Sequence, residues 1–75
     1  MNGRLPNLTA RQLVAALKRA GFMEVRQKGG HLHLKRPTTD AVTTVPMHPG
    51  DLKRPLLKAI LRQAGLSETD FRRLL

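Results

Sequence analysis

The chain contains no cysteine, tryptophan or tyrosine among its 75 residues. Without cysteine there is no disulfide framework, no thiolate zinc site and no cysteine nucleophile. Phe22 and Phe71 are the only two residues with large aromatic rings, and the apolar residues around them predict that both belong to the core. Proteins that bind single strands by stacking bases need exposed aromatic rings, so the sequence argues against that mode of binding.

Long apolar segments are also missing. No run approaches the ~20 residues that cross a membrane, and residues 1–8 lack the apolar centre of a secretory signal. We therefore expect no membrane association and a cytoplasmic protein. The length of 75 residues suits one domain over 1–75, in which residues 1–8 are expected to be a flexible lead-in.

Acidic residues are few, and basic residues dominate. The chain has 14 lysines and arginines against 5 acidic residues, which gives a net charge of +9 at pH 7. Such a charge favours nucleic acid or an acidic protein as partner, although basic residues can also simply solvate a surface. The scattered acids do not suggest a two-metal nuclease, and there is no phosphate-binding GxxxxGK loop. We expect no metal and no other cofactor, so any catalysis depends on histidine, basic side chains and backbone amides.

Helical patterns lie on both sides of a central region with a different period. A helix is predicted from Thr9, whose spacing to Gln12 matches a capping box, and it should end at Gly21. A second helix is predicted around Pro55, a residue tolerated in a first helical turn, and should end at Gly65. A short terminal helix follows it.

Three strands are predicted between the helices, over residues 22–28, 31–35 and 41–46. The Gly29-Gly30 pair supplies the turn of a hairpin between the first two strands. The order α-β-β-β-α with a short final helix favours an α+β fold, in which a three-stranded antiparallel sheet carries the helices on one face.

Alternation along the strands predicts which side chains meet the helices. Leu32 and Leu34 should face the core, and Met23 and Val25 form the apolar side of the first strand. The wet face then carries the basic and imidazole side chains of Arg26, Lys28, His31, His33 and Lys35.

The third strand breaks this simple pattern. Val42 and Val45 cannot point to the same side of a strand with a period of two. A bulge or an edge position would reconcile them, and the sequence does not distinguish the two.

His31 is the first candidate for chemistry. It follows two glycines, so it is open to a large ligand, and glycine N–H groups can approach a phosphate closely. Imidazole exchanges protons near neutral pH, and RNA supplies its own nucleophile, the 2′-OH. Arg26, Lys28 or Lys35 would then stabilise the charge that develops on the phosphate. The alternative is that His31 is a solvent-facing strand residue beside an ordinary turn.

Two other histidines are secondary candidates. His33 lies on the same strand face as His31. It could serve as a second proton-transfer group or share a metal ion with His31, but an H-x-H pair lacks the third ligand of a zinc site. A structural or RNA-contacting role for His33 is therefore favoured. His48 follows the third strand and either faces the same ligand or caps the next helix. The sequence leaves open which neighbour completes the proton transfer.

Taken in order, four segments resemble the HicA toxins, or YcfA-like proteins, of bacterial type II toxin–antitoxin pairs. The segments are TARQLVAALKRAGF, KGGHLHLKRP, VTTVPMHPGDL and LLKAILRQAGLS, which together extend from about Thr9 to Ser67. The resemblance implies a fold like that of double-stranded-RNA-binding domains. It also implies a ribosome-independent mRNA endonuclease that needs no metal, arrests translation and is held inactive by a HicB antitoxin.

The resemblance also assigns roles to residues. The catalytic histidine of the family's G-S-H motif falls on His31, with Gly30 where the family has serine, so a hydroxyl is missing. Arg54-Pro55 stands where the family usually has Gly-Thr. The antitoxin is expected to cover the His31 surface, partly through acidic contacts. We expect a monomer when free and a hetero-oligomer with antitoxin. The residues assigned to RNA contacts are Arg26, Lys28, Gly29, Gly30, His33, Lys35 and His48.

Two other functions fit the same composition. One is an RNA-binding module without catalysis, or an inactive toxin relative that acts in a regulatory complex. The other is a pure protein-interaction partner with only nonspecific affinity for RNA. Substitution of His31 by alanine distinguishes an enzyme from a binding module. It abolishes cleavage by an enzyme and barely changes the RNA affinity of a binding module.

Overall fold

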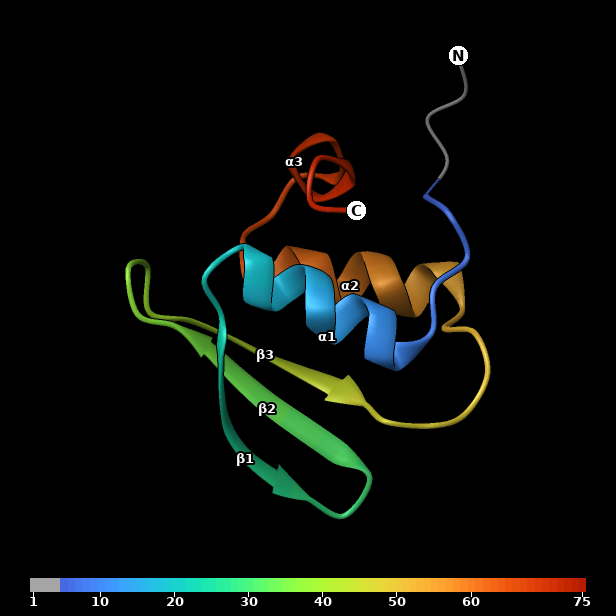
Figure 1. Cartoon of the computed structure of the whole chain (residues 1–75), viewed down its shortest axis with the longest axis horizontal. Helices are drawn as coiled ribbons and strands as arrows, with labels where there is room; N and C mark the ends of the chain where they lie inside the picture. The colour runs from blue at the N-terminus through green and yellow to red at the C-terminus, as the bar shows by residue number, and fades with distance from the viewer. Residues whose placement is uncertain (1–4) are drawn as a thin grey trace.

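The computed structural model describes residues 5–75. Its elements are α1 (Ala10–Arg19), β1 (Met23–Lys28), β2 (His31–Arg36), β3 (Ala41–Pro46), α2 (Arg54–Ala64) and α3 (Glu68–Arg72). The strands form one antiparallel sheet in the order β1-β2-β3. Helices α1 and α2 lie side by side on one face of the sheet, and α3 packs beyond them, away from the strands (Figure 1). The expected α+β fold, like that of double-stranded-RNA-binding domains, is confirmed.

Helix α1 begins and ends as its sequence predicts. The Thr9 hydroxyl accepts from the Gln12 N–H at 3.2 Å, and the Gln12 side chain accepts from the Thr9 N–H at 2.9 Å, which completes the capping box. At the other end Gly21 has a φ of +99°, a conformation that favours glycine. The N–H of Phe22 then bonds back to the carbonyl of Leu17 at 3.0 Å, so the turn delivers Phe22 to the core.

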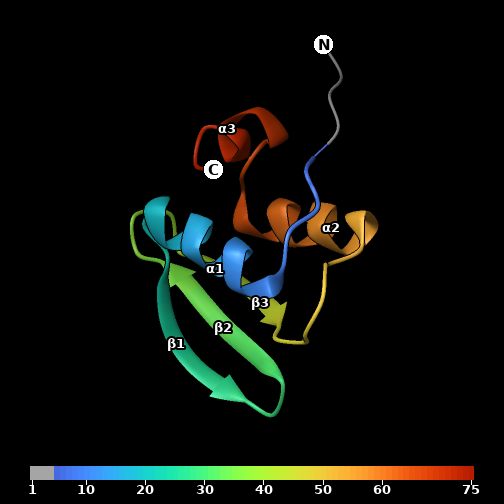
Figure 2. The ribbon, with the colours of Figure 1, turned by 45° about the vertical axis from the view of Figure 1, so that its right-hand side comes forward.

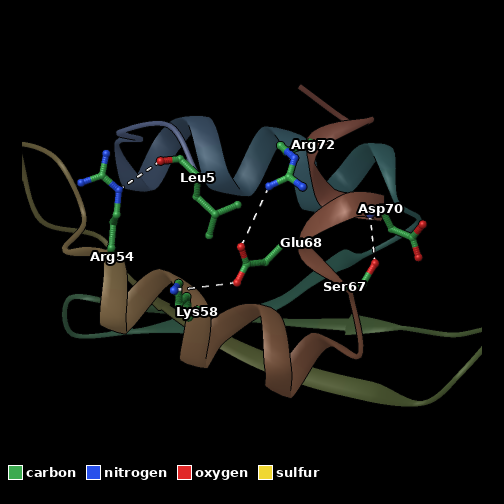
Figure 3. A network of polar contacts seen from close by, with 7 residues as sticks. All are labelled: Leu5, Arg54, Lys58, Ser67, Glu68, Asp70 and Arg72. Carbon is green, nitrogen blue, oxygen red and sulfur yellow. Dashed lines mark hydrogen bonds and ion pairs between the residues drawn. The ribbon is translucent and has the colours of Figure 1, made fainter. Parts of the chain in front are cut away.

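Helix α2 ends in the same kind of turn. Gly65 has a φ of +72°, and the N–H of Leu66 bonds to the carbonyl of Leu61 at 3.0 Å. This turn leads into α3, whose Glu68 carboxylate lies 4.0 Å from Lys58 of α2 (Figure 3). The buried ring of Phe71 holds α3 against the rest of the core.

The segment before α1 differs from the expected flexible lead-in. Leu5 and Leu8 are 1% and 6% exposed and belong to the core. The Arg54 guanidinium Nε donates to the Leu5 carbonyl at 3.1 Å, which ties this segment to the start of α2 (Figure 3). The prediction of a flexible lead-in is wrong for residues 5–8, because Leu5 and Leu8 are buried in the core in spite of Pro6 between them. Residues 1–4 lie outside the described part of the chain.

Leu32 and Leu34 of β2 are both buried and face the helices, as predicted. The conflict between Val42 and Val45 is resolved without a bulge, because β3 is an edge strand whose pairing with β2 is continuous. Val45 is buried, whereas Val42 is 53% exposed on the other face. Between them Thr43 takes a core position, where its hydroxyl donates to the Ile60 carbonyl at 3.2 Å.

Strand β1 departs from its predicted alternation. The register shifts between Glu24 and Arg26, so Val25 lies in a bulge. The shift turns Glu24 toward the helices, where it forms an ion pair with Lys18 of α1. Met23 and Val25 are not core residues: they are 61% and 60% exposed. An extra residue in a strand reverses the faces of everything on one side of it, and the sequence pattern does not reveal that insertion.

Candidate active site

The face of the sheet that carries no helix is hereafter called the open face. Cross-strand pairing assigns side chains to it, since paired residues in a sheet point to the same side. Lys28 pairs with His31, and Arg26 pairs with His33. The structure therefore brings four of the predicted site residues together on the open face, as the alternation along the two strands predicted.

Lys35 lies apart from this group. It shares the open face and β2 with His31 but lies four positions further along the strand, a distance of about 13 Å at the usual strand rise. Its ammonium group lies 3.6 Å from an Asp40 carboxylate oxygen in the next turn. Of the three predicted phosphate contacts, Lys28 and Arg26 are thus the two near His31.

His31 is held at the tip of the β1–β2 hairpin. Gly29 has a φ of +59°, so the turn uses the left-handed conformation that glycine adopts without strain. His31 begins β2 directly after this turn, and it is exposed. A large ligand can therefore reach the imidazole from the end of the sheet.

The loop after β3 brings a second histidine to the same place. The N–H of Met47 donates to the Gly30 carbonyl at 2.6 Å, which fastens the loop to the hairpin tip. His48 follows, and its ring centroid lies 6.4 Å from that of His31, with the two ring planes at 80°. Both rings are exposed. The sequence left open whether His48 faces the ligand of His31 or caps the next helix. The N-cap of α2 is Lys53 and receives no side-chain cap bond, and the His48 ring instead lies beside that of His31.

Gly30 lies beside the ring of His48. A Cβ atom at position 30 would lie 3.7 Å from Cε1 of His48, an ordinary contact. Position 30 therefore has room for the serine of the G-S-H motif, which would stand against His48. The glycine here leaves that side of the His48 ring uncovered.

His33 has a different environment. Its Nδ1 lies 3.0 Å from the Thr44 hydroxyl of β3, and the side chain is half-buried. Within residues 5–75, neither His31 nor His48 has a comparable side-chain hydrogen bond. The structure thus separates the three histidines into one that is fixed within the sheet and two that are open to a ligand.

A hollow adjoins His48. Its volume is about 440 Å³, and it lies between the start of α1 and the loop after β3. The backbone bridge between Thr9 and Asp51 and the bond from the Leu52 N–H to the Leu8 carbonyl at 2.7 Å hold these segments together. The residues that line it are Thr9, Ala10, Arg11, Met47, His48, Pro49 and Gly50.

Arg11 is the site residue that sequence reasoning missed. Its position on the outer side of a helix is typical of a solvated charge, and only the bridge between Thr9 and Asp51 brings it near the loop that carries His48. No local sequence signal predicts this approach. Arg11 adds a cation to the hollow that His48 also lines.

Residues 5–75 contain neither a metal-binding cluster nor a membrane-spanning helix. No cluster of three or more histidine, cysteine or acidic side chains there could hold a metal ion. No helix in the same range is long and apolar enough to cross a bilayer.

The order and spacing of these elements match a known family. The model of the HicA toxin of bacterial toxin–antitoxin systems matches residues 10–66, which include α1, the whole sheet, the loop with His48 and α2. The chain belongs to the HicA toxin family. It is therefore a toxin that is paired with an antitoxin. The matched range contains every residue of the site described above except Thr9. No curated protein matches the chain.

Arg54-Pro55, where this HicA toxin departs from its family, lies away from the histidines. Pro55 occupies the first turn of α2 and Arg54 binds the Leu5 carbonyl. The departure at Gly30, in contrast, lies at the site itself.

Proposed function

We propose that this HicA toxin is an mRNA endoribonuclease that cuts RNA independently of the ribosome, without a metal or other cofactor, and that a HicB-like antitoxin neutralises it. The observation that carries the proposal is the pairing of His31 with His48 at an exposed end of a basic surface. Two free imidazoles can serve the two proton transfers that RNA cleavage requires.

The reaction is a displacement within the RNA backbone. One imidazole takes the proton of a 2′-OH while that oxygen bonds to the adjacent phosphorus. As the bond from phosphorus to the 5′-oxygen breaks, the other imidazole, in its protonated form, donates a proton to the departing oxygen. The products are a 2′,3′-cyclic phosphate and a 5′-hydroxyl. His31 is one member of this pair, and the geometry supports His48 as the other.

Cations near the two histidines would stabilise the negative charge that develops on the phosphate during this displacement. Lys28 pairs with His31 across the hairpin, Arg26 lies next along β1, and Arg11 lines the hollow beside His48. Negative charge builds on the non-bridging phosphate oxygens during the displacement, and fixed cations lower the energy of that state. Backbone N–H groups at Gly29 and Gly30 are further phosphate contacts.

The other predicted contacts receive narrower roles. His33 is held by Thr44, which suits a contact to RNA and not a proton transfer that needs a free ring. Lys35, at the far end of β2 beside Asp40, would contact the RNA backbone away from the cut. Because the substrate is mRNA, the site of action is the cytoplasm.

The test is cleavage of a structured mRNA by the wild-type protein and by His31→Ala, with and without EDTA. We expect His31→Ala to lose about 10²- to 10⁴-fold in rate, the range of one proton-transfer group, and to retain most RNA affinity. His33→Ala is the matched control and should keep most activity. Wild-type cleavage that EDTA abolishes while folding and binding persist would contradict the proposal. If neither protein cleaves and both bind RNA, the toxin is a binding module.

A further inference from the structure

Strand β1 is the least covered element of the described chain. All six of its residues, Met23–Lys28, are exposed, and within residues 5–75 no other strand pairs with its outer edge. Figure 2 shows β1 sweeping away from the helices, so its outer edge faces open space. An edge strand of this length presents a row of backbone N–H and C=O groups that can pair with another chain.

Apolar side chains gather along this edge. Met23 and Val25 are each at least 60% exposed. Met23 pairs with Lys35, which in turn pairs with the exposed Val42, so two exposed apolar side chains flank Lys35 on the open face at the end away from His31. Methionine and valine offer RNA neither charge nor a stacking surface. Apolar side chains beside a free strand edge instead fit a protein segment added to the sheet.

The charge of the strand specifies that segment further. Arg26 and Lys28 project from β1, and the open-face residues of the three strands include no acid, since Glu24 turns toward α1. Two copies of β1 paired with each other would place the cations Arg26 and Lys28 of one copy against those of the other. The edge is thus unfavourable to a second copy of this chain and favourable to an acidic strand.

We propose that the outer edge of β1 receives an extended acidic segment of the antitoxin as a fourth strand of the sheet. The identity of the partner follows from the toxin–antitoxin family, and the mode of inhibition rests on the proposed function. A six-residue strand is about 20 Å long, so the added segment runs along β1 from Met23 to Lys28, which pairs with His31. Its acidic side chains form ion pairs with Arg26 and Lys28. These two cations near the histidine pair are then no longer available to bind RNA.

Hydrogen exchange tests the site without requiring catalysis. Amide exchange is measured on the free toxin and on its complex with its antitoxin. Amides of 23–28 that exchange freely in the toxin alone should slow by about tenfold or more in the complex, and the outer edge of β3 should not change. A complex that leaves β1 unprotected overturns the proposal, and so does protection of β1 by substrate RNA in place of antitoxin.

Charge substitution tests the same edge by affinity. Val25→Glu places a negative charge where the acidic strand would lie, and should weaken antitoxin binding by about tenfold or more, as loss of an anchoring side chain does. The matched control is Leu56→Glu, at another exposed apolar residue on α2, which should bind normally. Both variants should keep the cleavage rate of the wild type when antitoxin is absent. Equal antitoxin affinity of the two variants would overturn the proposal, whereas absence of cleavage by any variant would count against the proposed function alone.

Discussion

At the scale of single residues, the site depends on a contact that the sequence does not reveal. The two glycines before His31 identify that histidine as open to a ligand. His48 is far along the chain, and it reaches His31 because the Met47 N–H bonds to the Gly30 carbonyl. Sequence reasoning could therefore nominate His31 and keep His48 as an option, but it could not pair them. Arg11 was not predicted for the same reason, because the bridge between the distant residues Thr9 and Asp51 positions it.

The glycine at position 30 leads to a prediction at this scale. Gly30→Ser should fold normally, because its Cβ would lie 3.7 Å from His48 Cε1. The added hydroxyl can hydrogen-bond to the ring or to the bound phosphate, and one such bond, at about 1 kcal/mol, corresponds to roughly a fivefold faster cleavage. The measurement is the single-turnover rate on one RNA substrate.

Gly30→Ala is the control for this prediction, because it adds the same Cβ without a hydroxyl. The alanine variant should cleave no faster than the wild type. Equal rates for the serine and alanine variants would mean that the missing hydroxyl has no part in catalysis.

At the scale of elements, local signals were sufficient where they act on neighbouring residues. The capping box at Thr9 and the glycine turn at Gly21 set the limits of α1 as predicted. The bulge at Val25 was invisible because it depends on how β1 meets β2, and it reversed the expected face of Met23. The burial of Leu5 was missed because its partners lie on distant elements.

The start of α1 provides a prediction about stability. Thr9→Ala removes the hydroxyl that accepts from the Gln12 N–H at 3.2 Å, and the free energy of unfolding should fall by about 1 kcal/mol. Urea denaturation followed by circular dichroism measures the change. Thr38→Ala, in the exposed turn between β2 and β3, is the control and should unfold like the wild type. A Thr9→Ala protein as stable as this control would show that the cap contributes nothing.

At the scale of the whole molecule, the net charge of +9 is distributed in a way that suits two successive partners. Apart from the pair between Lys35 and Asp40, the ion pairs described here lie on the helix side and around α3, as with Glu24 and Glu68. The open face keeps Arg26 and Lys28 beside the histidines. Under the two proposals above, this basic surface would attract RNA when the toxin is free and an acidic strand when antitoxin is present, and we predict that the two partners exclude one another.

The most direct measurement of the central claim compares two RNA substrates that differ in one atom. The second substrate has sulfur in place of the bridging 5′-oxygen at the cleaved bond, and a thiolate departs without a donated proton. On the ordinary substrate, His31→Ala and His48→Ala should each lose about 10²-fold or more. On the sulfur substrate, the variant that lacks the acid should recover nearly the wild-type rate, and the variant that lacks the base should remain slow. A His48→Ala protein that cleaves the ordinary substrate at the wild-type rate would contradict the account.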